Sequence, residues 1–404
     1  APLAARLYLR DADGTYYHAR STGDGGKAVP YGLRRGLSAE VHTSLSAHPF
    51  VADLPPGRYT LDAERGKEYF PAVQDIEIAA GDGAPRELVL RLRRWTNMAE
   101  RGWYSGETHV HRRVAELPTL LLAEDLNVAL PLTAWVTDSR EAPSGANKNP
   151  EPVPAAELIE VDGTHVIWPI NTEYEIFSID GKSHTLGAVF ILNHREPFDL
   201  TAPPVRPIAA EARRQGALLD LDKHNWPWSM MIVPEMGVNL YELTNNHVWR
   251  TRFLFSNWYP EYIGEHMAVE RDGGHYTERG WIEFGFQNYY TLLNCGFQLQ
   301  PTAGTASGVH PVPLGFGRVY VKIEGEFSYG KWIEGLAGGR SFVTTGPMLT
   351  TSMRRAGDKV QVIGLYEGAH PPAGIEVVVN GEVAHMIDAQ PERTEAGSHR
   401  VEFT

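Results

Sequence analysis

The sequence predicts an α/β protein whose central region is flanked by two regions of β-strands. Three observations predict this class. Residues 1 to about 95 alternate apolar and polar side chains with a period of two, the middle of the chain alternates helical stretches with short apolar strands, and the period of two returns after about residue 347. A chain of 404 residues also exceeds what one hydrophobic core usually serves. We therefore expect three regions, 1–98, 99–347 and 348–404.

The first region contains ARLYLRDADGTYY, LPPGRYTLDAERG and RELVLRLRRW, which read as strands bounded by turn residues and predict a small β-sandwich over 1–98. The last region repeats this alternation in DKVQVIGLY and GIEVVVNGEVAHMI, where Asn380 and Gly381 predict a tight hairpin turn. We expect residues 348–404 to form a C-terminal β segment.

Helix-then-strand units fill the central region. Each of three segments begins as a helix and runs into a buried strand: LPTLLLAEDLNVALPLTAWV, AAEARRQGALLDLDKH and YYTLLNCGFQLQPTAG. Such units imply parallel strands with right-handed crossovers, and hence either an α/β barrel or a doubly wound sheet. In both folds the ligand site lies at the carboxyl ends of the strands.

Composition narrows the classes of partner. Hydrophobic residues make up 42% and charged residues 22% of the chain, as in ordinary globular proteins, and no apolar run approaches the ~20 residues of a spanning helix, so we expect no membrane insertion. The formal charge of −13 disfavours binding to nucleic acid.

With one cysteine, the chain offers only histidine and carboxylate as metal ligands. It begins at Ala1 without methionine, so we expect a secreted or periplasmic protein whose signal peptide has been removed.

The stretch GWYSGETHVHRR places His109 and His111 two residues apart. On a strand, side chains two apart share a face, so both imidazoles can reach one ion. Polar residues at other strand ends are further candidates: Glu173 and Glu175 in INTEYEIF, His184, His224 after LLDLDK, Glu242 in YELTNN, and His247. A lone histidine is more often structural than a ligand, so it is the coincidence of several that predicts a metal site.

Imidazole and carboxylate together suit Zn²⁺, Mn²⁺ or Fe²⁺, and a bridging carboxylate can hold two ions ~3.5–4 Å apart. Such an ion lowers the pKa of bound water toward ~7, which favours hydrolysis without a protein nucleophile. The sequence contains no G-x-S-x-G, P-loop, G-x-G-x-x-G or H-E-x-x-H motif that would favour another template.

The ordered series GETHVH, INTEYEI, SHTLGAVFIL, LLDLDKH, YELTNN, LLNCGFQLQPTAGTASG and LAGGRSFVTTGPML, over residues 100 to 350, resembles the PHP (polymerase and histidinol phosphatase) metallohydrolases, in the branch named for carbaryl hydrolase. The resemblance implies a distorted (β/α)7 barrel over 99–347 with metal ions at its carboxyl-end face. It also implies a set of ligands: His109 and His111 from the first motif, Glu173 as the bridging carboxylate with Glu175 as its substitute, His184, and His224.

Two motifs depart from the family pattern. Residues 133–135 read Thr-Ala-Trp where the pattern has Thr-Asp-His, and residues 304–308 read Gly-Thr-Ala-Ser-Gly where it has Gly-Ser-Asp-x-His. Asp138 and His310 lie a few residues downstream and are the possible substitutes. With fewer ligands than the family pattern, we expect one or two divalent ions, Zn, Mn or Fe.

Around the metal, His224 and His247 are the candidate proton relays, and Arg250 is a candidate clamp for an anionic substrate. Trp226 and Trp228 flank a proline, and we expect exposed rings there that stack on sugar or aryl groups. The expected partner is therefore a small molecule or a carbohydrate, and the sequence does not indicate an oligomeric state.

Three functions fit these observations. The first is a metal-dependent hydrolase acting on an ester, phosphoester, amide or glycan-related bond. The second is a non-catalytic glycan-binding protein on a degenerate PHP scaffold, which the two altered motifs favour. The third is a metal-assisted polysaccharide lyase, in which the ion acidifies a proton next to a carboxylate. Metal content separates the second from the others, and an unsaturated product absorbing in the near ultraviolet identifies the third.

Overall fold

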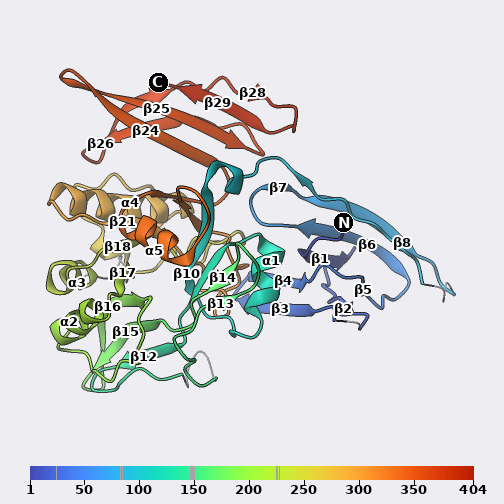
Figure 1. Cartoon of the computed structure of the whole chain (residues 1–404), viewed down its shortest axis with the longest axis horizontal. Coiled ribbons are helices and arrows are strands. Elements are labelled where there is room, and N and C mark those ends of the chain that lie inside the picture. Colours follow the sequence, from blue (N-terminus) through green and yellow to red (C-terminus); the bar gives the residue numbers. More distant parts are fainter. Residues whose placement is uncertain (24, 82, 84, 146–150, 224–225, 227) are drawn as a thin grey trace.

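The computed structural model describes residues 1–404 except 24, 82, 84, 146–150, 224, 225 and 227. It is a mixed α/β structure with several sheets and few helices. The N-terminal strands lie on one side of the central region, and the C-terminal sheet lies along another side of it (Figure 1). Among the described residues, no helix is both long and apolar enough to cross a membrane.

The N-terminal region is built on one antiparallel five-stranded sheet. In spatial order its strands are β3 (Ala28–Arg35), β4 (Ser38–Leu45), β1 (Ala5–Asp11), β6 (Gly57–Glu64) and β8 (Ala72–Ile78). Two short pairs accompany it: β2 (Arg20–Ser21) with β5 (Phe50–Val51), and β7 (Tyr69–Phe70) with β9 (Arg93–Arg94).

The expected strand at RELVLRLRRW forms only in part. Only Arg93 and Arg94 pair as a strand, in β9, while Leu88, Leu90 and Leu92 pack in irregular conformation against the core of the five-stranded sheet. The alternating leucines therefore indicate that one side of this extended segment is buried. Burial alone does not require a neighbouring strand to supply the hydrogen bonds of a ladder.

The central region contains two six-stranded sheets. The first sheet has the order β13 (Ile159–Glu160), β14 (Val166–Ile167), β11 (Val128–Pro131), β10 (Trp103–Val110), β22 (Arg318–Lys322) and β23 (Ser341–Thr344). The second sheet has the order β12 (Ala134–Asp138), β15 (Thr172–Ile179), β16 (Lys182–Leu192), β17 (Leu218–Asp222), β18 (Leu240–Thr244) and β21 (Gln300–Ala303).

Five α-helices accompany these sheets in the described part of the chain: α1 (Leu117–Glu124), α2 (Arg206–Arg214), α3 (Ser229–Met236), α4 (Glu278–Asn294) and α5 (Tyr329–Ala337). Short elements are the 3-10 turns η1 (Ala99–Arg101) and η2 (Pro260–Tyr262) and the pair β19 (Arg271–Asp272) with β20 (His275–Tyr276). The three predicted helix-then-strand units are confirmed as α1 with β11, α2 with β17, and α4 with β21.

Parallel crossovers occur at two of the three predicted units, those of α1 and α4, whereas the α2 unit connects the antiparallel strands β16 and β17. Helices α1, α3 and α4 each connect two parallel neighbours: β10 to β11, β17 to β18, and β18 to β21. Strand β16, however, runs antiparallel to both β15 and β17, because a short hairpin at residues 179–182 joins β15 to β16. The second sheet is therefore mixed.

The two faces of the second sheet have different partners. On the outer face, Ile191, Leu219 and Tyr241 pack with α2, α3 and α4 in a large apolar core. On the inner face, Phe190 and Leu240 pack with residues of the first sheet, including Val319 and Val321 of β22. The inner face is thus enclosed between the two sheets, away from solvent.

The C-terminal region forms a four-stranded antiparallel sheet and a separate hairpin. The sheet has the order β24 (Met348–Ala356), β25 (Lys359–Gly368), β29 (His399–Phe403) and β28 (Glu392–Arg393), and the hairpin joins β26 (Ile375–Val379) to β27 (Glu382–Ile387). The predicted hairpin turn is confirmed: Asn380 and Gly381 both have positive φ, 54° and 88°, as a two-residue turn of this type requires.

Buried charges join the N-terminal sheet to the central region. Arg6 of β1 pairs with Glu124 of α1, and Arg65 contacts Asp125 at 2.5 Å. Beside them, the Glu40 carboxylate lies 2.7 Å from Nδ1 of His42, and both residues are almost fully buried. Burial lowers the pKa of His42 to about 4, although the Glu40 carboxylate acts in the opposite direction. His42 is therefore neutral in the folded protein at pH 7.

We predict that His42 contributes to loss of stability in mild acid. The unfolded chain protonates this imidazole near pH 6.5, whereas the folded protein takes up the proton only near pH 4. The stability that neutral His42 contributes is therefore complete above pH 6.5 and is lost as the pH falls from 6.5 to 4. The free energy of unfolding should fall by at most about 1.4 kcal/mol per pH unit from this group. Urea unfolding at pH 7.5, 6 and 5 should give a flatter pH profile for His42→Gln than for the wild type. The exposed His48 provides the control, and equal slopes for wild type and His42→Gln would contradict the assignment.

Candidate metal centre

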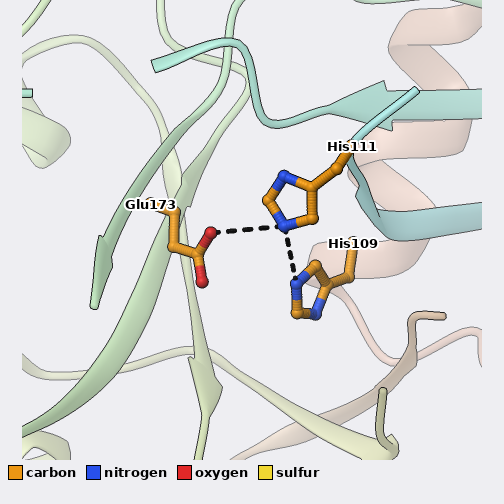
Figure 2. Close-up of side chains that lie close together, drawn as sticks. All are labelled: His109, His111 and Glu173. Atoms are coloured by element: carbon orange, nitrogen blue, oxygen red, sulfur yellow. Dashed lines mark hydrogen bonds and ion pairs between the residues drawn. The ribbon is translucent and has the colours of Figure 1, made fainter. Parts of the chain in front are cut away.

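The two histidines of the HxH motif lie at the carboxyl end of β10. His109 is the next-to-last residue of the strand and His111 follows its end, and both side chains are buried, at 1% and 5% exposure. Their Nε2 atoms are 3.2 Å apart (Figure 2). The ring of His109 packs against Phe190 of the second sheet, with ring centres 4.4 Å apart, which fixes its orientation.

Glu173 reaches the same point from the other sheet. It lies near the start of β15, is fully buried, and points its Oε2 at Nε2 of His111, 3.4 Å away (Figure 2). The three side chains thus bring two imidazole nitrogens and a carboxylate oxygen together, with ligand atoms all within 4.8 Å of one another. We call His109, His111 and Glu173 the histidine group.

The spacing in the histidine group fits a shared ion. Nitrogen or oxygen ligands bonded at ~2.1 Å to one ion, with angles between 90° and tetrahedral, lie roughly 3.0–3.4 Å from each other. The distances from His111 Nε2 to His109 Nε2 and to Glu173 Oε2, 3.2 and 3.4 Å, match this range. A single imidazole nitrogen has one proton or one lone pair in the ring plane, so His111 Nε2 cannot form good hydrogen bonds to both neighbours.

Glu242 of β18 lies on the other side of His109. Its two carboxylate oxygens lie 3.2 and 3.1 Å from Nδ1 of His109. A carboxylate that accepts the Nδ1–H makes Nε2 the nitrogen that carries the ring's lone pair, on the side of His111, and this is the usual arrangement behind a metal-bound histidine. Without a cation, burial raises the pKa of Glu242 well above its ordinary value, and the nearby Asp222 raises it further.

Asp222 is the last residue of β17 and lies beside Glu242, because Asp220 is aligned with Leu240 in the parallel ladder. His109, Asp222 and Glu242 form a second set of converging ligand atoms. Asp222 is fully buried; Glu242 is a hydrogen-bond partner of its side chain, and no N–H or hydroxyl group of the described residues donates to its Oδ1. A buried carboxylate oxygen in that condition is costly unless a cation or water contacts it, so this atom also fits a bound ion.

Lys223 brings a positive charge to the same place. Its side chain is 4% exposed, its Nζ lies 3.1 Å from Oε1 of Glu175, and it also contacts the Asp222 carboxylate. Burial alone would lower the pKa of Lys223, but the charges of Asp222, Glu175 and Glu173 raise it above the ordinary value. The lysine is therefore an ammonium ion inside a set of carboxylates.

The loop of the altered Gly-Thr-Ala-Ser-Gly motif holds the end of β10 in place. The backbone N–H of Ala306 donates to the carbonyl of His109 at 2.7 Å, and the N–H of His111 donates to Ser307 at 2.9 Å. Glu107 anchors the same loop by accepting from the N–H of Thr305 at 2.8 Å. Burial raises the pKa of Glu107 to about 8. The loop of the altered motif thus has a structural role, because it holds the end of β10 in place.

A residue of the N-terminal sheet also contacts this loop. The Tyr31 hydroxyl of β3 accepts from the N–H of Gly308 at 2.9 Å and donates to the carbonyl of His310 at 2.6 Å. The loop is therefore held on one side by β10 and on the other by the N-terminal region.

The other predicted site residues lie in different surroundings. His184 is half-buried in β16, with its ring 5.6 Å from that of Trp228, and it is not part of the converging groups found among the described residues. His224 lies outside the described residues. His247 is buried among aromatic rings, 4.1 Å from Phe255 between ring centres. Arg250 donates to the Tyr8 hydroxyl at 2.7 Å and pairs with Glu64 at 3.0 Å, so its guanidinium faces the N-terminal sheet.

The positions that depart from the family pattern are occupied in other ways. Trp135 donates its indole N–H to Glu175 at 3.1 Å. Asp138 is exposed and accepts from the hydroxyl of Thr137 at 3.0 Å, while His310 Nδ1 lies 2.9 Å from an Arg35 nitrogen. Neither Asp138 nor His310 belongs to the converging groups in the described part of the chain.

The expectation of two exposed tryptophans after β17 is wrong for one of them. Trp228 is 45% exposed, but Trp226 is 2% exposed and packs against Phe177, with ring centres 5.2 Å apart. The chain turns back at Lys223, whose carbonyl accepts from the N–H of Trp226 at 2.9 Å, and this turn folds the ring inward.

Sequence reasoning did not include Asp222 and Lys223 in the site. The spacing of Asp220 and Asp222 in LLDLDK carried a signal, since two aspartates two apart in an apolar strand place both carboxylates on one buried face. Lys223 gave no such signal, because in a regular strand it would point to the opposite face.

No family model matches the sequence, and no curated protein matches it. A solved structure of a two-domain protein from Bacteroides vulgatus ATCC 8482, containing a predicted PHP-like metal-dependent phosphoesterase, aligns with 74% of this chain and 86% of its own, at 10% sequence identity and a TM-score of 0.36. A likeness at this level supports no argument about fold or function.

We predict that Gly304→Ala disrupts the centre. A Cβ at Gly304 would lie 2.1 Å from Cβ of His109 and 2.5 Å from Oε1 of Glu242, and both neighbours are fully buried. The substitution should lower the free energy of unfolding by about 1–3 kcal/mol and weaken metal binding, because His109 must move. Urea unfolding and metal titration test this. Gly330→Ala is the matched control, since a Cβ there meets nothing within 4 Å, and equal effects of the two substitutions would contradict the prediction.

Proposed function

We propose that this protein is a metal-dependent hydrolase in which the histidine group holds a divalent ion. The observation that carries the proposal is the meeting of His109, His111 and Glu173, from two different sheets, at distances that suit a common ion. Two further observations support the proposal: Glu242 accepts from the far side of the His109 ring, and the buried Asp222 and Glu242 carboxyl groups lie together beside His109.

The bound ion would supply a nucleophile at neutral pH by lowering the pKa of water, and it would polarise the bond to be cleaved. The chain provides the rest. Glu242 holds the Nδ1 proton of His109 and so directs Nε2 at the site. Asp222 offers Oδ1, which we assign as a further ligand or as the acceptor of the proton that leaves the attacking water. The roles predicted for His224, His247 and Arg250 remain predictions.

For the fold we propose the distorted (β/α)7 barrel of the PHP superfamily over 99–347. The order of motifs along the sequence supports it, and so does the way the two central sheets adjoin. Strand β21 of the second sheet lies beside β10 and β22 of the first, and two residues link β11 of the first sheet to β12 of the second. The carbaryl-hydrolase-like branch rests on the motif order alone.

Nitrogen and carboxylate ligands suit Zn, Mn or Fe, and we propose one of these as the metal. The substrate classes that fit are an ester, phosphoester, amide or glycan-related bond, on a small molecule or carbohydrate. We retain the secreted or periplasmic location as a proposal.

The alternative of a non-catalytic glycan-binding protein is favoured by Trp135, which occupies a position where the family pattern has a ligand. The metal-assisted lyase uses the same ion and differs in its product.

We predict that the metal depends on the HxH motif. His109→Ala and His111→Ala should each weaken metal affinity by at least 100-fold, because each removes a ligand from a small set, whereas His385→Ala in the exposed hairpin should have no effect. Elemental analysis after dialysis, with circular dichroism to confirm folding, provides the measurement. A folded wild-type protein that takes up no Zn, Mn or Fe would rule out the hydrolase and favour the binding protein.

The same proteins test catalysis. The metal-loaded wild type should hydrolyse at least one of a generic phosphodiester, an aryl ester and an acidic polysaccharide. Chelator should abolish this activity and added metal should restore it, while His109→Ala should remain inactive. A near-ultraviolet absorbing product from the polysaccharide would assign the lyase instead.

A further inference from the structure

We infer that the Lys223 ammonium is a built-in cation that occupies the place of a second metal ion, so that the centre holds one ion per chain. The inference rests on the proposed function, since it concerns how many ions the proposed site takes. It starts from the fact that the three sets of converging ligand atoms are not equivalent.

One set is made only of carboxylates: Glu173, Glu175 and Asp222, all buried, with ligand atoms within 4.8 Å of one another. Lys223 binds this set. Its Nζ lies 3.1 Å from Oε1 of Glu175 and contacts the Asp222 carboxylate. The histidine group is a different set of ligand atoms, in which His111 Nε2 lies 3.2 Å from His109 Nε2 and 3.4 Å from Glu173 Oε2.

The backbone directs the lysine into this position. In a regular strand, Lys223 would point away from the face that carries Asp222, because neighbouring side chains alternate. Lys223 instead has a φ of 53°, in the left-handed region that residues with a side chain seldom adopt. Its carbonyl accepts from the Ser229 hydroxyl at 2.6 Å and from the Trp226 N–H at 2.9 Å, so the start of α3 holds the turn.

A second divalent ion would compete with the Lys223 ammonium for the oxygens of Glu175 and Asp222. Two metal ions in a shared site are typically ~3.5–4 Å apart and are joined by a bridging carboxylate. Glu173 is the residue common to the histidine group and the carboxylate set, so it has the position of that bridge. With Lys223 on the carboxylate side, Glu173 would lie between one ion and the carboxylates that bind the ammonium.

The experiment counts ions. Full-length protein is stripped with chelator and titrated with Mn²⁺, and bound manganese is measured by elemental analysis and by electron paramagnetic resonance. The wild type should saturate at one ion with the signal of an isolated Mn²⁺. Lys223→Ala should take up two ions with a spin-coupled signal, while Lys223→Arg, which keeps the charge, should retain one. Lys182→Ala, at an exposed lysine of β16, is the matched control and should also bind one ion.

The outcomes separate the two proposals. Two coupled ions in the wild type, or one ion in a folded Lys223→Ala, would overturn the role of Lys223 and leave the hydrolase standing. No ion in the folded wild type would overturn both. If Lys223→Ala does not fold, the wild-type stoichiometry and the spectrum of its bound manganese still decide.

Discussion

The burial of carboxylates on the inner face of the second sheet is the constraint on which the rest of the centre depends. Glu173, Asp222 and Glu242 are each fully enclosed, on the same face as the apolar Phe190 and Leu240. Charges in such a place are tolerated only when counter-charges or hydrogen bonds reach them, because their transfer from water costs several kcal/mol each. The imidazoles of β10 and the ammonium of Lys223 lie close to these carboxylates, and the proposed ion would complete the compensation of charge.

The geometry also explains why the centre lies between two sheets. Strand β10 contributes histidines from the first sheet, while β15, β17 and β18 contribute carboxylates from the second. In the converging groups of the described residues, the histidines come from the first sheet and the carboxylates come from the second. Glycine at position 304 allows the loop after β21 to pass directly over His109, so the two sheets approach closely enough for the ligand atoms to meet.

The three helix-then-strand units could be predicted from the sequence, because a helical period followed by a short apolar run indicates the type of each element, as in α2 and β17. The HxH pair and Glu173 could also be proposed, since a period of two determines which side chains share a face. The antiparallel course of β16 depends on a short hairpin, and the irregular path of Leu88 to Leu92 depends on packing, so neither follows from alternation. Lys223 could not be placed, because its direction depends on one left-handed residue and on the hydroxyl of Ser229.

The hydrogen bonds of Tyr31 have a consequence for how the regions of the chain communicate. This tyrosine belongs to the N-terminal sheet, yet it holds Gly308 and His310 in the loop that supports His111. The loop and the N-terminal sheet therefore stabilise each other through these two hydrogen bonds. The sheet thereby supports the surroundings of His111, although none of the converging ligand atoms found among the described residues comes from it.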